Sequence, residues 1–593
     1  MSDDGAVAAR LEEFADLLEA KGVEYKPRAY RRAAENVRDS PANVAALAED
    51  GPEAVQEIEG VGEAIAEKVV EFVETGAIEE LEDLREELPV DMAALTRIEG
   101  VGPKTVGTLY EALGIEDLDD MKEAAEAGEI RDVSGFGAKT EENIRDGIEF
   151  ARQAGERQLL GDARPRGEGV VEYLAERPAV ADIELAGSLR RWKATIGDVD
   201  VLVGSDDPTA VVEAFTDWPA ADETIEAGDQ KASVRASGVR VDLRVVDPAE
   251  FGAAIQYFTG SKDHNVAVRN RAIDRDLTMN EYGTFDVSEA QSASGSRTES
   301  GGDADSDRRA GERVAGETEA GMYDAVGLPW IPPELRENRG EIEAAAEGEL
   351  PDLVGVGDVC GDLHVHTEWS DGGHTIAEMV EAAAEFGHDY VAITDHATGP
   401  GMVGGVGLDD ERIREQLPEI RAVADDADID VFAGIEANID TDGTISVADD
   451  LLADLDIVVA SPHADIGGEG TDRLVAAAEH PEVDIVGHPT GRYINQREGL
   501  AIDVERLASV AAARDTALEV NANPARLDLD GAAVKQAAEA GATVAVNTDA
   551  HSPPRYELVR YGVHTARRGW AEAGDVLNAR DADGVRDFLG GDA

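Results

Sequence analysis

Two groups of residues that could bind metal ions lie far apart in this sequence. The first consists of carboxylates and contains Asp198 and Asp200, whereas the second mixes histidines with carboxylates and extends from His364 to His551. Carboxylate oxygens suit Mg²⁺, which usually also binds phosphates of its substrate. Imidazole and carboxylate together suit Zn²⁺ or Mn²⁺. Two metal chemistries in one chain predict two active sites, both acting on phosphate esters.

Three β-strands would hold the carboxylates of the first group on one sheet. The pattern predicts these strands at residues 180–186, 198–203 and 239–245. Because side chains alternate along a strand, Asp198 and Asp200 should project from one face, and Asp242 lies on the polar side of the third strand. Three such carboxylates can bind two metal ions, which stabilise both oxygens of an in-line phosphoryl displacement. A lone Asp-x-Asp pair is more often a turn or a sheet edge, but here a Gly-Ser turn and two arginines precede it.

A second set of strands would carry the histidines. Residues 360–593 alternate short apolar runs with helical segments, as in a β/α barrel, whose active sites lie at the carboxyl ends of the strands. The apolar runs are 390–394, 431–435, 457–460, 485–487, 518–521 and 543–547. The potential ligands stand at strand ends or in the opening histidine pair: His364, His366, Asp395, His396, Glu436, His463, His488, Asp549 and His551. A lone histidine is more often structural, but of 11 histidines only His264 precedes residue 360, which favours a metal site.

Length and composition favour several globular domains and no membrane span. The chain has 593 residues, too many for one hydrophobic core, and 42% of them are hydrophobic. No apolar run reaches about 18 residues and the polar start lacks a signal-peptide pattern, so we expect a cytoplasmic protein. The single cysteine, Cys360, excludes an internal disulfide and a thiolate zinc cluster, so zinc would need histidine and carboxylate ligands.

The charge balance is strongly acidic. The chain has 127 acidic and 53 basic residues, which gives a net charge of −74. Proteins that bind nucleic acids usually carry basic clefts, because phosphate contacts dominate their affinity. We expect a halophilic protein from a cytosol at molar salt, where the Debye length is about 3 Å and surface repulsion is screened. The alternative is a protein that avoids polyanions.

Residues 1–155 follow a helical pattern that three glycine hairpins interrupt. The glycine pairs are Gly60 and Gly62, Gly100 and Gly102, and Gly135 and Gly137. Each hairpin should open a helix, whose free N–H groups and positive dipole end can bind a phosphate of DNA without a basic side chain. One Gly-x-Gly is usually only a packing turn, whereas three in register resemble helix-hairpin-helix modules.

A polar stretch interrupts the second half of the predicted phosphoryl-transfer domain. Residues 287–315 are rich in Ser, Gly, Asp and Glu and cannot bury enough apolar surface to offset chain entropy. We expect a disordered insertion here, centred on 291–309, with order resuming at Gly321. A linker at 336–358 would follow and contain a short helix from Gly340 to Gly348.

The run from Gly187 to Asp200 resembles the nucleotidyltransferase signature of family X DNA polymerases, the family of polymerase beta. It reads Gly-Ser-Leu-Arg-Arg, then five residues, then Gly-Asp-Val-Asp, and a later Tyr-Phe-Thr-Gly-Ser run at 257–261 resembles the same family. The resemblance implies that Asp198, Asp200 and Asp242 are the catalytic ligands of Mg²⁺ or Mn²⁺.

The same resemblance implies contacts with an incoming nucleotide. The residues concerned would bind the triphosphate, the sugar, or the nucleotide and template from the minor-groove side: Gly187, Ser188 and Arg191; Tyr257 and Phe258; Asn265 and Arg269. Basic residues are concentrated around the last of these segments, against the acidic background.

The last part of the chain resembles the polymerase and histidinol phosphatase domain, abbreviated PHP. This resemblance implies up to three ions of Zn²⁺ or Mn²⁺: one bound by His364, His366, Glu436 and Asp549, a second by Glu436, His463 and His488, and a third by Asp371, His396 and His551. Every matching position is occupied, so we expect metal-dependent hydrolysis of a phosphodiester. Four histidines match no motif position and should be structural: His374, His388, His480 and His564.

Lys68 follows the first glycine hairpin and has two interpretations. Residues 60–68 resemble the lyase segment of polymerase beta, in which a lysine attacks the aldehyde of an abasic sugar. Here Ala64 replaces a second lysine, and Glu63 and Glu67 add negative charge that favours the protonated, unreactive amine. A lyase nucleophile and a solvated surface lysine both stay open.

The order of these parts is similar to bacterial and archaeal family X polymerases over nearly the whole chain. It comprises a helical domain at 1–155, a nucleotidyltransferase palm and thumb at 156–335 and a PHP barrel at 359–593. We expect a DNA repair polymerase, as in base excision repair, that binds gapped or nicked duplex and dNTPs. The barrel would act as a 3′→5′ exonuclease, an apurinic-site endonuclease or a 3′-phosphoesterase.

Two alternatives come from other functional classes. One is a PHP phosphatase for small phosphate esters whose front half only tethers it to DNA, and the other is a non-catalytic scaffold that bridges DNA ends. The intact Asp198, Asp200 and Asp242 argue against the first, and the two complete ligand sets argue against the second.

Overall fold

The chain folds into two compact units. The computed structural model describes residues 4–23, 26–38, 44–49, 51–56, 58, 60–98, 100–155, 157–288, 309, 311–401 and 406–590. One unit comprises Met1–Arg157 with Tyr493–Glu498, and the other comprises Gln158–Arg492 with Gly499–Ala593. No helix in these described ranges is both long enough and apolar enough to cross a membrane.

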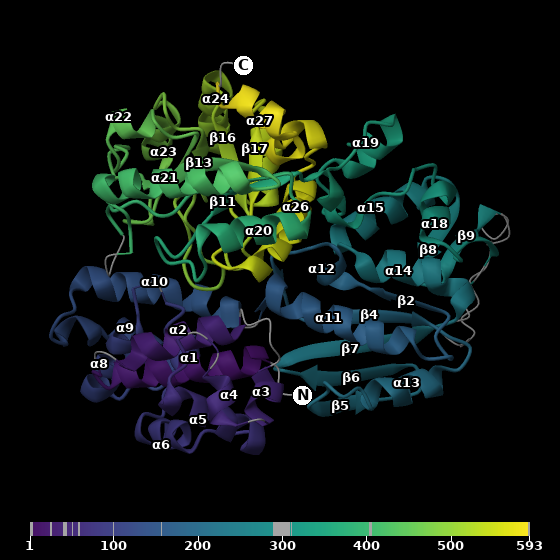
Figure 1. The fold of residues 1–593 in the computed structure, drawn as a ribbon. Helices are drawn as coiled ribbons and strands as arrows, with labels where there is room; N and C mark the ends of the chain where they lie inside the picture. Colours follow the sequence, from purple (N-terminus) through teal and green to yellow (C-terminus); the bar gives the residue numbers. More distant parts are fainter. Residues whose placement is uncertain are drawn as a thin grey trace. The chain divides into compact units, whose positions relative to one another are not determined.

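The first unit is helical, as predicted (Figure 1). Its α-helices are α1 (Asp4–Ala20), α2 (Lys26–Arg38), α3 (Val44–Glu49), α4 (Pro52–Val55), α5 (Glu63–Thr75), α6 (Glu79–Glu87), α7 (Met92–Leu95), α8 (Pro103–Leu113), α9 (Leu118–Ala127) and α10 (Ala138–Gly155). They share one apolar core, in which the rings of Phe14 and Tyr30 pack with centroids 4.6 Å apart. Each glycine hairpin therefore lies on a buried framework that fixes the start of the helix after it.

The second unit begins with a five-stranded palm sheet in the order β2-β4-β7-β6-β5. Its strands are β2 (Asp182–Leu185), β4 (Val199–Gly204), β5 (Glu223–Ala227), β6 (Lys231–Ala236) and β7 (Val239–Val246), and a separate pair joins β1 (Gln158–Leu159) to β3 (Thr195–Ile196). Helices α11 (Leu160–Ala175) and α13 (Pro208–Thr216) pack on the sheet, and α12 (Gly187–Arg190) follows β2. The three predicted strands are confirmed as β2, β4 and β7. Strands β5 and β6 were not predicted, because β5 is exposed along its whole length and has no apolar alternation.

The thumb contains a three-stranded antiparallel sheet of β8 (Leu277–Asn280), β9 (Gly283–Asp286) and β10 (Glu312–Ala315). Its helices are α14 (Phe251–Thr259), α15 (Lys262–Ile273), α18 (Glu319–Ala325) and α19 (Glu341–Glu347). Residues 289–308 and 310, most of the expected insertion, lie outside the described residues. Order resumes earlier than predicted, since β10 and α18 begin before Gly321. Strand pairing requires backbone hydrogen bonds but does not require apolar side chains. The composition of this segment therefore did not reveal β10.

The expected linker at 336–358 also starts too early. Arg336 is fully buried and forms an ion pair with Glu319, with Nη1 and Oε1 2.6 Å apart. In α19, Ile342 and Ala345 pack into the thumb core, and Glu341 contacts His264. The first part of the presumed linker therefore belongs to the thumb. A seven-residue helix between two glycines looked like a spacer because its buried ion pairs leave no sequence pattern.

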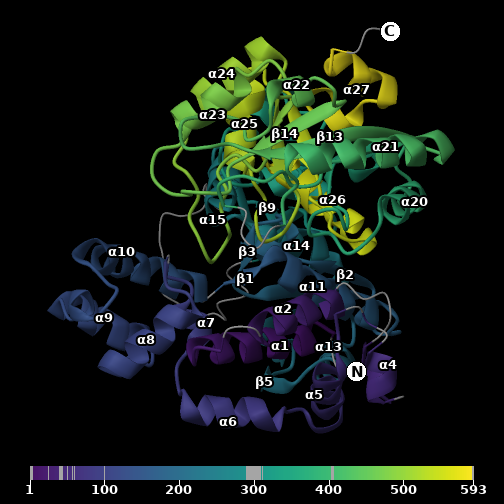
Figure 2. The ribbon, with the colours of Figure 1, turned by 60° about the vertical axis from the view of Figure 1, so that its left-hand side comes forward.

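The PHP part is a nearly closed barrel of seven parallel strands in sequential order, surrounded by helices (Figure 2). The strands are β11 (Gly361–Val365), β12 (Tyr390–Ile393), β13 (Asp430–Asn438), β14 (Ile457–Ser461), β15 (Ile485–Val486), β16 (Ala517–Asn521) and β17 (Val544–Asn547). The helices are α20 (Ile376–Phe386), α21 (Asp410–Asp426), α22 (Asp449–Leu452), α23 (Thr471–Ala478), α24 (Val504–Arg514), α25 (Gly531–Glu539), α26 (Val559–Arg568) and α27 (Ala582–Phe588). All six predicted strands are confirmed. A bridge between Val365 and Ala550 joins the first strand to the end of the last and brings both ends of the domain to one edge.

Candidate active sites

The three palm carboxylates meet on neighbouring parallel strands. Asp200 in β4 stands opposite Asp242 in β7, and Asp198 lies just before β4. One oxygen from each of Asp198, Asp200 and Asp242 lies within 4.8 Å of the other two. The structure therefore brings together the carboxylates that the alternation predicted. Hard oxygen donors at this spacing fit a divalent cation.

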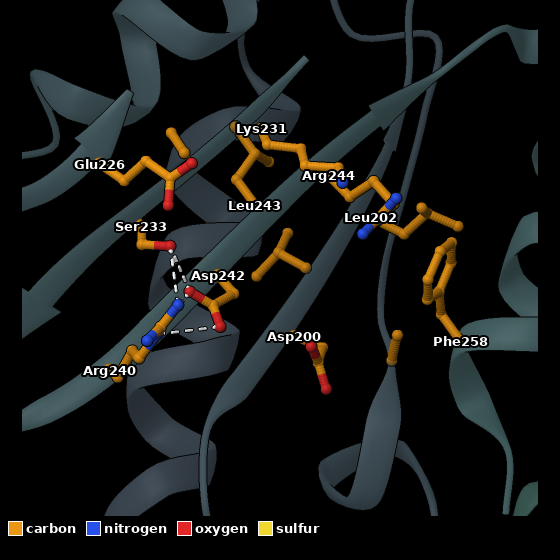
Figure 3. Close-up of a pocket in the computed structure, with 13 residues that line it drawn as sticks. Asp200, Leu202, Glu226, Lys231, Ser233, Arg240, Asp242, Leu243, Arg244 and Phe258 are labelled. Atoms are coloured by element: carbon orange, nitrogen blue, oxygen red, sulfur yellow. Dashed lines mark hydrogen bonds and ion pairs between the residues drawn. The ribbon is translucent and has the colours of Figure 1, made fainter. Parts of the chain in front are cut away.

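The carboxylates of the palm repel one another. Burial and the charges of Asp198 and Asp242 raise the pKa of Asp200 to about 7. Asp242 accepts hydrogen bonds from Ser233 and from Arg240, whose Nε is 2.8 Å from Oδ1 (Figure 3). A divalent cation would relieve this repulsion. The cation and Arg240 would then share the oxygens of Asp242.

The start of α12 touches the metal-binding group. Gly187 has φ +60°, and a Cβ atom there would lie 2.0 Å from Oδ2 of Asp200, so only glycine fits. Ser188 follows in the same turn. Arg191 is 3.1 Å from Oε1 of Glu337 through Nε and donates a second hydrogen bond to the carbonyl of Thr259. Arg191 thus joins the predicted triphosphate turn to the end of α14.

A cavity of about 350 Å³ lies against the carboxylates, and both acidic and basic residues line it (Figure 3). Asp200, Asp242, Lys231, Arg244 and Phe258 are among its lining residues, and the guanidinium of Arg244 lies 4.3 Å from the ring centroid of Phe258. The carboxylates, three cations (Lys231, Arg240 and Arg244) and an aromatic face together suit a nucleoside phosphate bound through a metal ion. Lys231 and Arg244 had no place in the sequence prediction, since Lys231 belongs to the strand pair that was missed.

Of the remaining predicted nucleotide contacts, only Phe258 lines this cavity, and the others lie on α14 and α15. The rings of Tyr257 and Phe258 are nearly perpendicular, with centroids 5.2 Å apart, and Tyr257 is 41% exposed. Asn265 donates to the carbonyl of Tyr257 over 2.7 Å and accepts from Gln256, so its amide holds the backbone of α14 in place. Arg269 lies exposed on α15. The Tyr257 ring and Arg269 are the two groups accessible to a nucleic acid.

The second site lies at the carboxyl ends of the barrel strands. Side-chain atoms within 4.8 Å of one another form three groups: His366, Asp371, His396 and His551; His364, His366 and Asp549; and His396, Glu436 and His463. His488 joins the last group, with Nε2 3.0 Å from Oε1 of Glu436. All nine predicted positions come together. The grouping differs from expectation in two respects. His366 and His396 each reach two groups, and Glu436 groups with His396 and His463 but not with His364, His366 and Asp549.

Buried polar atoms without hydrogen bonds point into this centre. They include Nε2 of His364, both ring nitrogens of His366, Oε2 of Glu436 and Nε2 of His463. Unpaired buried groups of this kind are costly, and bound cations would pair them. The nitrogen and oxygen donors fit Zn²⁺ or Mn²⁺. The backbone is strained here as well: the non-glycine residues His488 and Asp549 have φ +23° and +55°.

The charges of the centre are strongly coupled. Burial opposes ionisation of Glu436, but His396, His463 and His364 outweigh it and hold the pKa of Glu436 well below its usual value. Burial and the neighbouring His396 and His551 lower the pKa of His366 to about 4, which leaves its imidazole neutral. Ionised carboxylates and a neutral imidazole are the forms that bind metal ions.

The three glycine hairpins share one geometry. Gly60, Gly100 and Gly135 all have positive φ, and the residue after each donates to the apolar residue two positions before it: Val61 to Ile58 (3.1 Å), Val101 to Ile98 (2.9 Å) and Phe136 to Val133 (3.1 Å). The second glycine of each hairpin directly precedes α5, α8 or α10. Free N–H groups therefore begin each helix, as predicted.

Four family models match successive parts of the chain. They are a helix-hairpin-helix domain at 4–78, a SAM-like helix-hairpin-helix tandem at 92–149, a DNA polymerase beta thumb at 254–337 and a PHP domain at 362–523. Their order agrees with the parts described above.

Curated relatives decide the family. The DNA polymerase/3′-5′ exonuclease PolX of Bacillus subtilis is 35% identical over 587 residues, which cover 98% of each chain. The chain belongs to the PolX family of DNA polymerases. Rat DNA polymerase lambda is 26% identical over 352 residues, 56% of each chain. A probable phosphatase of Caldanaerobacter subterraneus is 33% identical over 207 residues, 32% of this chain and 75% of the phosphatase.

This PolX chain contains supporting residues that sequence reasoning missed. Glu519 accepts from Nδ1 of His364 (2.7 Å) and Asn438 accepts from Nδ1 of His463 (2.8 Å), so each ring turns Nε2 toward the centre. Their one sequence signal is a polar residue within a buried barrel strand. Asp395, expected as a possible ligand, instead accepts hydrogen bonds from Thr367, Ser370 and Gln416 and is a structural residue.

Lys68 in this PolX chain is neither isolated nor fully solvated. Its amine is 2.5 Å from Oε2 of Glu80 and 5.2 Å from the ring centroid of Phe14, and 15% of the side chain is exposed. The lyase and surface-lysine interpretations therefore both remain predictions, and the structure adds a carboxylate partner from α6 that the local sequence does not reveal. A nucleophilic amine would first have to leave this ion pair.

Proposed function

We propose that this protein is a DNA polymerase that fills short gaps and also processes 3′ ends by metal-dependent hydrolysis in its PHP domain. The observation that carries the proposal is the coexistence of two ligand sets that share no residue: the carboxylates of the palm and the nine histidines and carboxylates of the barrel. The full-length match to a polymerase and exonuclease supports it.

In the palm, Asp198, Asp200 and Asp242 would hold Mg²⁺ or Mn²⁺, which supplies charge stabilisation for nucleotidyl transfer. The chain's own groups position the nucleotide. The Gly187-Ser188 turn touches Asp200, so a triphosphate held there lies beside the carboxylates. Lys231 and Arg244 add positive charge to the cavity for the phosphates or the polar edge of the nucleotide. Phe258 lines the cavity, and Tyr257 next to it would contact the sugar.

In the barrel, up to three ions of Zn²⁺ or Mn²⁺ would supply Lewis acidity and an activated water for hydrolysis of a phosphate ester. Glu519 and Asn438 hold two imidazoles in the tautomer that leaves Nε2 free. Asp371 lies at the rim, with 39% of its side chain exposed and Oδ1 3.2 Å from Nε2 of His551. A ligand at the rim can coordinate an ion that also contacts a substrate phosphate.

DNA with a gap or nick is the proposed substrate. Three helix starts offer backbone N–H groups to phosphates at separate points, which suits a duplex more than a small metabolite. Arg269 on α15 and the exposed Tyr257 lie where the thumb can contact the nucleotide and the template.

The direct test measures both reactions on the purified full-length chain. Extension of a primer across a short gap and shortening of a labelled 3′ end should both occur and should both stop when a chelator removes the metal ions. Metal analysis should find Zn²⁺ or Mn²⁺ bound before any substrate is added. A chain that bridges or binds DNA ends without either reaction would be a scaffold and would refute the proposal.

A second candidate rests on the similarity to probable phosphatases, one of them 33% identical over 207 residues. In this interpretation the barrel hydrolyses small phosphate esters and the front half only tethers it to DNA. Efficient hydrolysis of small monoesters together with absent primer extension would favour it. Extension that depends on Asp200 excludes it.

Lys68 can be tested separately as a lyase nucleophile. Borohydride trapping on a 5′-deoxyribose-phosphate substrate would leave a covalent adduct that Lys68→Ala lacks and Lys104→Ala, a matched lysine in α8, retains. No adduct at any salt concentration would exclude a lyase. Glu80→Gln should increase trapping if the ion pair with Glu80 restrains the amine.

A further inference from the structure

Four cationic side chains line a cavity that neither catalytic centre uses. The cavity has a volume of about 260 Å³ and lies between the palm and the PHP barrel within the second unit. The cations are Lys193, Arg339, Arg492 and Arg568, and Asp530 is the one acidic residue among those that line it. In a chain with 127 acidic and 53 basic residues, such a concentration of positive charge calls for an anionic ligand.

A strained turn builds the palm side of this cavity. Trp192 has φ +53°, a costly conformation for a bulky residue. Its ring stacks on His564 of α26, with centroids 3.5 Å apart and planes 6° apart, and the guanidinium of Arg164 covers the ring at 3.3 Å. Lys193 comes next in the turn and lines the cavity. Residues of both domains therefore fix the position of the lysine.

The PHP side is attached to the same turn. Arg568 at the end of α26 donates over 2.5 Å to the carbonyl of Arg191 and lies 3.3 Å from Oε1 of Glu337. Glu337 also contacts Arg191 and, at 3.8 Å, Lys193. One carboxylate is thus shared by three cations, so the positive charge around it is not neutralised.

Two further cations leave the balance positive. Arg492 uses Nε and Nη2 for the carbonyls of Arg526 and Leu527 and lies 3.4 Å from Asp530 through Nη1. Arg339 is exposed, and its guanidinium makes no hydrogen bond or ion pair with any residue that the structure describes. Burial and the charges of Arg568, Arg191 and Arg339 outweigh Glu337 and lower the pKa of Lys193. A bound phosphate would reduce the repulsion among these cations.

The cavity is connected to both catalytic centres. On the palm side, Lys193 lies two residues after Arg191 and two residues before β3, which leads to Asp198. On the PHP side, Arg492 holds the carbonyl of Arg526, whose Nε is 3.8 Å from Oδ2 of Asp549. Residues that line the cavity are therefore linked, by sequence or by contacts, to residues of both centres.

We propose that the cavity binds a phosphodiester of a single DNA strand that extends between the polymerase and PHP centres. The inference rests on the proposed function and adds a site to it. The shared chemistry is a phosphate group, which free phosphate or pyrophosphate could also supply. A strand fits better, because the cations come from both domains and the exposed Arg339 lets a polymer leave the cavity.

The test measures binding of a single-stranded oligodeoxynucleotide to the full-length protein over a range of KCl concentrations. The double variant Lys193→Ala/Arg339→Ala should bind roughly tenfold more weakly, and the slope of log K against log salt should fall by about 0.7 for each phosphate that the variant no longer neutralises. Arg414→Ala, an exposed arginine of α21 beside Asp450, should change neither value. An unchanged affinity and slope in the double variant would overturn the proposal.

Two further measurements separate the remaining outcomes. If inorganic phosphate or pyrophosphate binds wild type but not the double variant while oligonucleotide binding is equal in both, the ligand is a free phosphate and the proposal fails. Hydrolysis of a small phosphodiester and the thermal unfolding temperature show whether the variant is folded. Wild type that binds the oligonucleotide through Lys193 and Arg339 but neither extends nor shortens DNA would refute the proposed function and leave the site intact.

Discussion

The two metal centres of this chain differ in how completely the protein builds them. In the palm, Asp198, Asp200 and Asp242 are partly exposed, and Asp242 already has Arg240 as a partner. In the barrel, His364 and Glu436 are 0% exposed, and unpaired atoms face the centre. The first centre needs a substrate whose phosphates complete the coordination. The second has enough donors to hold its ions before any substrate arrives.

The difference has an electrostatic reason. Partly exposed carboxylates are stabilised by water, so the palm can remain without ions between turnovers. Buried histidines and carboxylates have only each other, and their unpaired atoms cost free energy until a cation binds. We therefore expect metal ions to bind the palm together with the substrate and to be a structural component of the barrel.

The largest expected effect comes from removing one ligand of each centre. Asp200→Ala should reduce primer extension by about 10³-fold or more while 3′-end hydrolysis continues, because the ions supply several kcal/mol of charge stabilisation. His364→Ala should have the opposite effect. Gap-filling and exonuclease assays on the same preparations measure both.

Matched controls are Asp206→Ala, in the loop after β4, and His480→Ala, near the end of α23. Both should retain both activities. Loss of both reactions in either folded ligand variant would show that the centres are not independent and would remove the basis of the comparison.

A smaller effect should follow from a residue that only orients a ligand. Glu519→Gln weakens the hydrogen bond that fixes His364, and loss of such a partner typically costs about 10- to 100-fold in metal affinity or activity. Exonuclease activity and bound zinc or manganese should fall together, and adding metal ions should restore part of the activity. Primer extension should not change.

Glu505→Gln, in the outer helix α24, is the control for this change. If Glu519→Gln lowered exonuclease activity without changing metal affinity, Glu519 would act on the substrate and not through His364.

A buried carboxylate, Glu334, joins the end of the thumb to α26 and should make the stability of this contact depend on pH. Glu334 is 5% exposed and accepts from His564 (2.8 Å) and Arg567 (2.7 Å). Burial opposes its ionisation, but these two partners outweigh burial and lower the pKa of Glu334 to about 2 from 4.5. Since the folded pKa is the lower one, the stabilisation is complete above about pH 4.5 and disappears as pH falls toward 2.

Glu334→Gln should therefore lower the free energy of unfolding at pH 7 by up to about 3 kcal/mol, from 1.36 kcal/mol for each pKa unit. The difference from wild type should narrow below about pH 4, which denaturant unfolding at several pH values measures. Glu343→Gln on α19 should behave like wild type. A constant difference at every pH would mean that the variant disturbs packing and not charge.

The smallest expected effect is a difference in response to salt. Screening acts mainly on exposed charges, so concentrated KCl should relieve repulsion around the palm and between DNA and the acidic surface. Primer extension should rise several-fold toward molar KCl, and hydrolysis of a small phosphodiester in the buried barrel centre should change less. A steady decline of extension from about 0.1 M upward would contradict the halophilic interpretation.

Alternation and strand order predicted the carboxylates of the palm and most ligands of the barrel, whereas the nucleotide contacts and Asp371 were predicted from the family resemblance. Asp200 and Asp242 were recognisable because a period of two keeps them on one face, and the barrel histidines because they follow apolar strands. Sequence reasoning did not identify the roles of Glu519, Asn438 and Arg240. These roles depend on which side chain of another strand stands opposite each residue. The exposed strand β5 and the strand β10 were missed for a related reason, since backbone pairing leaves no mark on residue type.

Ion pairs between distant segments were equally hidden. Glu80 beside Lys68 and Glu319 beside Arg336 are ordinary acidic residues in a chain that has 127 of them. Sequence spacing predicts neighbours within a helix or a strand, but it does not select one carboxylate among so many. The unexpected partner of Lys68 and the correction to the presumed linker at Arg336 both arise from such pairs.

Recognition through the three glycine turns leaves the surrounding side chains free to change, whereas recognition through side chains does not. The groups that we expect to bind phosphates are main-chain amides at the starts of α5, α8 and α10, and the turns after Ile58, Ile98 and Val133 fix their positions. Substitutions of the surrounding surface residues do not move those amides. Over evolutionary time, a lineage could replace lysines with glutamates across these helices and lose none of its backbone donors for DNA.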